Sequence, residues 1–139
     1  MRHFVLDASV ALAWFVDNPI PIFAEQVQHR LAHGETAVVP VLWLMEIANG
    51  LIVAERRRKL SIADCTRAIE KIRQLLDTVI EISVDEISIL QNFETARTFQ
   101  LTSYDAMYID TARSARLPLA TLDRQMLKAA DRAGIKALF

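Results

Sequence analysis

Short apolar runs alternate along this chain with longer segments in which apolar residues recur at helical spacing. The short runs predict strands at residues 3–7, 36–39, 79–82, 118–121 and 135–139. The longer segments predict helices at residues 10–16, 22–33, 42–59, 61–76, 86–100, 103–115 and 123–134. Because alternating strands and helices favour parallel strands with helices on both faces, the pattern predicts an α/β fold with a central, mainly parallel, five-stranded sheet.

Two pairs of helices interrupt this alternation. No strand is predicted between the helices at 42–59 and 61–76, or between those at 86–100 and 103–115. We therefore expect these pairs to form an arm or a flank above the sheet.

Composition limits the class of protein more than its function. A chain of 139 residues is long enough for one hydrophobic core, so we expect a single domain spanning 1–139. The net charge of −1 argues against capture of nucleic acid by the whole molecule and leaves only a local basic patch. The single cysteine, Cys65, excludes an intrachain disulfide and suits a reducing compartment. With no signal-peptide pattern and no apolar run of membrane-spanning length, we expect a soluble, cytoplasmic protein.

Acidic residues occur at four places where the neighbouring sequence is predicted to be buried. Asp7 and Asp123 each follow a predicted strand, and Asp105 lies at the start of a predicted helix. Glu46 lies in a helical segment that is apolar on almost every side. Strand ends and the helix starts that follow them share one edge of a parallel sheet, where such folds bind ligands. If the first and fourth strands are neighbours, Asp7 and Asp123 would reach one cation.

Each of these acids also has a simpler interpretation. An aspartate before a helix commonly serves as its N-cap, which would explain Asp7, Asp105 and Asp123. A single glutamate on a helix is commonly solvated, although the neighbours of Glu46 leave little polar surface. Carboxylates gathered together repel one another, and burial raises their pKa, so a cluster needs a counter-charge. A hard divalent cation with oxygen ligands would supply it.

Four motifs, in this order and spacing, resemble the PIN-domain family and, within it, the VapC-type ribonuclease toxins of prokaryotic toxin–antitoxin pairs. The motifs are Phe4-Val5-Leu6-Asp7-Ala8-Ser9, Glu46 with Asn49, Ser103-Tyr104-Asp105-Ala106-Met107-Tyr108, and Leu119-Ala120-Thr121-Leu122-Asp123. Each motif alone is weakly specific, but together they extend over nearly the whole chain. The resemblance implies a three-layer α/β/α domain.

The resemblance also implies a reaction and a set of partners. It implies that Asp7, Glu46, Asp105 and Asp123 form a catalytic site that binds Mg²⁺ or Mn²⁺. Its supporting residues would be Ser9, Thr121 and Asn49, with Ser9 or Thr121 hydrogen-bonded to an acid or to metal-bound water. The implied reaction is hydrolysis of RNA to a 5′-phosphate and a 3′-hydroxyl. The implied partners are an RNA substrate, a cognate antitoxin protein and a second copy of the chain in a homodimer or a larger toxin–antitoxin assembly.

Other polar groups give weaker signals. His29 and His33 have the spacing of helical zinc ligands, but the HExxH pattern is absent, which argues against zinc. The basic run at residues 56–59 would suit RNA phosphates, but a basic helix C-terminus is the commoner explanation. Asp110 lies roughly 140° around its helix from Asp105, so we expect it to be peripheral or a salt-bridge partner.

Three other functions deserve comparison with a nuclease. A protein-binding module of the same fold, without catalysis, would use apolar side chains as interface anchors: Trp14, Phe15, Trp43 and Leu44. A receiver-like phosphoacceptor domain needs paired acids after the first strand and a lysine after the last, and the chain lacks both. Three glycines, none in a glycine-rich turn, argue against dinucleotide binding.

Overall fold

The strands of the computed structural model, which describes residues 1–139, form one parallel sheet. They are β1 (Phe4–Leu6), β2 (Ala37–Val39), β3 (Ile80–Ile82) and β4 (Leu119–Ala120), in the order β3-β2-β1-β4. Each neighbouring pair is parallel, as the alternation of strands and helices predicts. β1 and β4 are neighbours, which is the condition under which Asp7 and Asp123 would come close, and their pairing brings the chain segments that follow these two strands to one edge of the sheet.

The prediction of five strands is wrong, because the sheet has four. In the expected fifth strand, residues 135–139, only Ala137 forms an isolated parallel bridge, to Leu119. The backbone contacts are a bond from the Leu119 N–H to the Lys136 carbonyl and one from the Leu138 N–H to the Leu119 carbonyl. Ile135 and Leu138 are buried nevertheless. The apolar pattern of residues 135–139 therefore reflects burial at the edge of the sheet. This burial is reached with a single bridge and does not need a full strand.

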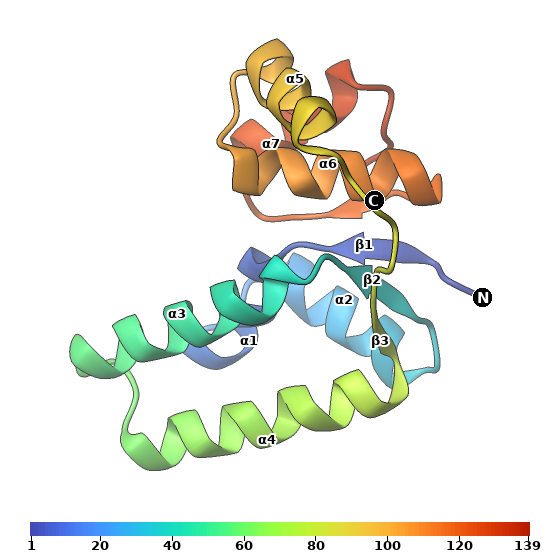
Figure 1. Ribbon diagram of the computed structural model, residues 1–139. Coiled ribbons are helices and arrows are strands. Elements are labelled where there is room, and N and C mark those ends of the chain that lie inside the picture. Colours follow the sequence, from blue (N-terminus) through green and yellow to red (C-terminus); the bar gives the residue numbers. More distant parts are fainter.

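All seven predicted helices are present, with ends that differ by a few residues. They are α1 (Ala8–Val16), α2 (Ile22–Ala32), α3 (Leu42–Arg56), α4 (Ile62–Thr78), α5 (Ile89–Phe99), α6 (Ser103–Ala115) and α7 (Arg124–Arg132). Helices α5, α6 and α7 gather on the β4 side of the sheet, whereas α3 and α4 lie on the opposite side and extend away from the strands (Figure 1). This pair is the expected arm. None of the helices combines the length and the apolar character that a membrane crossing requires.

The helix starts show which polar residues act as caps. Ser61 and Asp64 form a capping box at the start of α4. Ser9 and Ser103 occur where helical sequence patterns begin, a position typical of an N-cap, but each lies one or two residues inside its helix and neither caps it. Thr102 caps α6 instead, because its hydroxyl accepts the Asp105 N–H at 3.1 Å. Ser9 is free for another contact, described below.

The core surrounds β1 and β2, whose residues are completely buried. Trp43 has no exposed surface, and Trp14 is buried with its Nε1 donating to the Ala24 carbonyl at 2.8 Å. Phe15 and Leu44 are partly buried against the same core. The two tryptophans therefore pack inside the chain. The protein-binding alternative required them to be surface anchors for a partner, and they cannot serve as such.

Candidate active site

Two of the four candidate acids follow neighbouring strands. Asp7 comes directly after β1 and occupies the N-cap position of α1, and Asp123 follows β4 and caps α7. The Asp7 N–H donates to the Ala120 carbonyl at 2.9 Å, which continues the pairing of β1 with β4. Asp7 and Asp123 therefore lie together at the carboxyl edge of the sheet.

The other two acids reach this edge from helices. Asp105 is in the first turn of α6, and Glu46 is in the second turn of α3. Burial, then the charges of Asp7 and Asp123, raise the pKa of Asp105. Burial likewise raises the pKa of Glu46, and the charges of Asp7 and Asp105 add to it. These mutual effects show that four acids from distant parts of the sequence surround one region.

Asp7 is the most deeply buried of the four, with 5% of its surface exposed. Its Oδ2 accepts two hydrogen bonds of 2.7 Å, one from Ser9 Oγ and one from Thr121 Oγ1. Burial raises the pKa of Asp7, and the charge of Asp123 raises it further, while the two hydroxyls partly offset this by stabilising the carboxylate. Both supporting hydroxyls expected from the sequence thus contact an acid, and Asp7 Oδ1 is left without a side-chain partner.

The same hydroxyls also fix the backbone around Asp123. Ser9 Oγ accepts the Leu122 N–H, and Thr121 Oγ1 accepts the Asp123 N–H, both at 3.1 Å. Asp123 Oδ1 in turn accepts the N–H groups at the start of α7, whereas Oδ2 has no partner in the protein. Asp123 is therefore a helix cap, as its simpler interpretation held, and it still offers an oxygen to the shared region.

Tyr108 is a site residue that the sequence analysis missed. Its hydroxyl donates to Glu46 Oε1 at 2.6 Å, and its side chain is completely buried. The signal was present in the sequence, because Tyr108 lies three residues after Asp105 and so shares its face of α6. A buried tyrosine hydroxyl also needs a hydrogen-bond partner. The sequence alone did not show that this partner would come from α3.

Two further residues from the sequence analysis lie outside this cluster. Asn49, an expected supporting residue, is exposed on α3, and its side chain makes no hydrogen bond. Asp110 is completely buried and accepts from Thr95 at 2.6 Å and from Arg113 at 3.3 Å. As predicted, it is a salt-bridge partner; it helps to hold α5 against α6.

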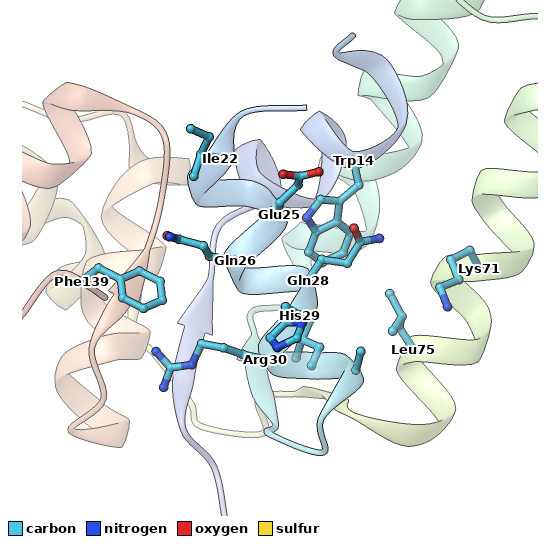
Figure 2. A pocket seen from close by; sticks show the side chains of 12 residues that line it. Trp14, Ile22, Glu25, Gln26, Gln28, His29, Arg30, Lys71, Leu75 and Phe139 are labelled. Carbon is cyan, nitrogen blue, oxygen red and sulfur yellow. The ribbon is translucent and has the colours of Figure 1, made fainter. Parts of the chain in front are cut away.

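A hollow of about 830 Å³ lies elsewhere, between α2, α4 and the last residue (Figure 2). Trp14, His29, Arg30 and Phe139 are among its lining residues, and none of the four acids is. The rings of His29 and His33 lie 4.0 Å apart, but no group of three metal-ligating side chains includes them. The zinc interpretation therefore has no geometric support.

The acid cluster has the chemistry of a site for a hard divalent cation. None of its four carboxylates forms an ion pair, although each of three has a pKa raised by burial and by its acidic neighbours. No three side chains already converge on one point as a complete ligand set. Mg²⁺ does not require this, because it commonly keeps several waters and takes one or two carboxylates directly. The donor set therefore fits Mg²⁺ or Mn²⁺.

Comparison with known proteins assigns the fold to a family. The family model of the PIN domain matches residues 4–132. The chain belongs to the PIN domain family. PIN domains are generally metal-dependent nucleases, which agrees with the carboxylate cluster described above.

One solved structure with this PIN fold is the crystal structure of PAE2754 from Pyrobaculum aerophilum. It aligns with a TM-score of 0.70 and 23% sequence identity, over 92% of this chain and 79% of that chain. At this identity the likeness supports the fold of the present PIN domain. A search among curated proteins finds no match.

Proposed function

We propose that this PIN domain is a cytoplasmic, Mg²⁺- or Mn²⁺-dependent endoribonuclease that acts as the toxin of a toxin–antitoxin pair. The observation that carries the nuclease assignment is the gathering of Asp7, Glu46, Asp105 and Asp123 at one edge of the sheet without a counter-charge. The toxin role rests on the resemblance of the sequence motifs to VapC-type proteins. That resemblance also supports a cognate antitoxin and a homodimer as partners.

The carboxylates are arranged so that each of three keeps one oxygen for a ligand. Protein donors occupy Asp7 Oδ2, Glu46 Oε1 and Asp123 Oδ1. Asp7 Oδ1, Glu46 Oε2 and Asp123 Oδ2 accept no side-chain hydrogen bond and are the oxygens that would face a cation or its waters. The hydrogen bonds to Asp7 Oδ2, Glu46 Oε1 and Asp123 Oδ1 hold these side chains in place before a ligand binds.

A bound divalent cation would polarise the scissile phosphate and lower the pKa of an attacking water. Asp7 and Asp123 would hold the cation, while Glu46 and Asp105 would orient its waters or take up the proton released on attack. Burial and the neighbouring acids raise the pKa of Glu46 and Asp105, which makes both better bases than an exposed carboxylate. In-line attack would leave a 5′-phosphate and a 3′-hydroxyl.

Cleavage of single-stranded RNA in Mg²⁺ tests the nuclease assignment. We expect Asp7→Asn and Asp123→Asn to lower the rate roughly 100-fold or more, because electrostatic stabilisation by a metal contributes several kcal/mol to such reactions. Asp131→Asn is the matched control, because Asp131 is exposed on α7 outside the cluster. Equal rates for wild type and Asp7→Asn, or full activity in EDTA, would refute the assignment.

Expression in a host cell tests the toxin role separately. Growth arrest that is lost in Asp123→Asn, while self-association remains, would support cleavage as its cause. Arrest that persists in this variant would favour the protein-binding module instead. A short neighbouring gene for a DNA-binding protein that captures the chain and relieves arrest would identify the antitoxin.

A further inference from the structure

Tyr108 links two elements that both carry acids of the candidate active site. It lies on α6, one turn after Asp105, and its hydroxyl reaches across to Glu46 on α3, 62 positions away in the sequence. The 2.6 Å distance to Glu46 Oε1 is that of a strong hydrogen bond to a charged group. Tyr108 is completely buried, whereas Glu46 is half-buried at the edge of the site.

The direction of this hydrogen bond is fixed by the chemistry of the two groups. A phenol has one proton to donate and a carboxylate has only acceptor oxygens, so the Tyr108 hydroxyl donates to Glu46 Oε1. Glu46 must then accept, which occupies Oε1 and leaves Oε2 without a protein partner. The hydroxyl thus joins α6, which carries Asp105, to Glu46 on α3.

We propose that Tyr108 is the positioning residue of the site: its hydroxyl fixes the carboxylate of Glu46 so that Oε2 faces the cation held by Asp7 and Asp123, or the waters of that cation. This proposal rests on the proposed metal-dependent function. A phenylalanine would fill the same volume in the core, so the hydroxyl itself is needed only for the contact with Glu46. Residues that orient metal-binding side chains in this way commonly change metal affinity or activity 10–100-fold when they are lost.

Titration calorimetry with Mn²⁺ alone tests the role without an activity assay. We expect Tyr108→Phe to weaken Mn²⁺ binding at least about 10-fold relative to wild type. Tyr104→Phe is the matched control on the same helix, because Tyr104 is 66% exposed and its hydroxyl has no hydrogen-bond partner. It should bind Mn²⁺ as wild type does. Unchanged affinity in Tyr108→Phe would overturn the positioning role while leaving the metal site in place.

A double-mutant cycle separates action through Glu46 from a general effect on the core. In a Glu46→Gln background, Tyr108→Phe should cause little further loss of Mn²⁺ affinity, because the group that it positions has already lost its charge. Equal losses in both backgrounds would show that Tyr108 acts on the site by another route and would overturn the proposal. A wild-type protein that binds no Mn²⁺ would overturn the proposed function as well.

Fluorine NMR tests the contact in a protein that retains the tyrosine. The chain has two tyrosines, so 3-fluorotyrosine incorporated into the Tyr104→Phe protein reports on Tyr108 alone. We expect its ¹⁹F resonance to shift on addition of Mg²⁺ and to saturate at the concentrations that support RNA cleavage. A resonance that stays in place while Mg²⁺ supports cleavage would overturn the proposal, whether or not Tyr108→Phe folds.

Discussion

Thr121 and Asp7 are 114 positions apart in the sequence, and their side chains are joined by a hydrogen bond of 2.7 Å. The Thr121 hydroxyl donates to Asp7 Oδ2, the same oxygen that accepts from Ser9. Both Thr121 and Asp7 are buried, so water does not compete for the bond. The parallel pairing of β1 with β4 produces this contact, because it places the ends of the two strands side by side.

Replacing Thr121 with valine should therefore destabilise the metal-free protein. The variant keeps the shape of the side chain but leaves a buried carboxylate with one donor fewer, at a cost of about 1–3 kcal/mol in the free energy of unfolding. Urea denaturation in EDTA measures this free energy. Thr121→Ser retains the hydroxyl, so its free energy of unfolding should fall less than that of Thr121→Val. Thr66→Val, on the exposed face of α4, should stay within about 0.5 kcal/mol of wild type.

The site illustrates what the sequence could and could not predict. Asp7 and Asp123 were found because a charged residue directly after a buried strand is conspicuous, whereas the pairing of β1 with β4 was only a condition in the sequence argument and is supplied by the structure. The partner of Tyr108 was not found, because it depends on how α3 and α6 are placed relative to each other in the fold. That placement comes from tertiary packing, which no local pattern in the sequence encodes.

The wrong assignments have a related cause. Ser9 matched the position of a helix cap, but its hydroxyl bonds to Asp7 and to the Leu122 N–H, which belongs to a segment 113 positions away. The apolar pattern of residues 135–139 matched a strand, but β4 has only two residues and supports one bridge. In both cases the local sequence pattern was correct for an isolated segment, but the neighbouring segments in the fold determined the structure.

The stability of the metal-free protein should depend on pH in the sense opposite to that of a salt-bridged acid. Burial raises the pKa of Asp7, Glu46 and Asp105 above their unfolded values. At pH values between the unfolded pKa and the raised folded pKa, the folded state binds more protons than the unfolded state. The free energy of unfolding therefore falls as pH rises through this range. Their contribution is fully present below the ordinary carboxyl pKa of about 4 and is lost above the raised values.

Unfolding of Asp7→Asn and wild type in EDTA, over a series of pH values, checks this dependence. The free energy of unfolding of Asp7→Asn minus that of wild type should increase as pH rises from about 4 toward 7. For Asp64→Asn the difference should change in the opposite sense and mainly below about pH 4, since the Ser61 backbone lowers the pKa of Asp64 in the folded state. A difference for Asp7→Asn that is constant with pH would mean that burial does not perturb this carboxyl.

Removal of the Asp110 side chain should loosen α5 from α6. Asp110→Ala leaves the Thr95 hydroxyl without its acceptor and breaks the ion pair with Arg113. Because Arg113 is 40% exposed and can be solvated, we expect a loss of about 1–3 kcal/mol rather than the full cost of a buried unpaired charge. Urea denaturation measures it, with Glu94→Gln on the exposed face of α5 as the control. A loss no greater than that of the control would show that the network contributes nothing.

Gly50 should resist a substitution that normally stabilises helices. Alanine in place of glycine inside a helix gains roughly 0.5–1 kcal/mol, but here a Cβ on Gly50 would lie 2.5 Å from both Cδ atoms of Leu12. We therefore expect Gly50→Ala to destabilise the wild-type protein, and to stabilise a Leu12→Ala background by about the normal amount. Urea denaturation of wild type, Gly50→Ala, Leu12→Ala and the double variant measures this change of sign. Equal stabilisation in both backgrounds would mean that the Leu12 side chain moves aside and that α1 and α3 do not need this close approach.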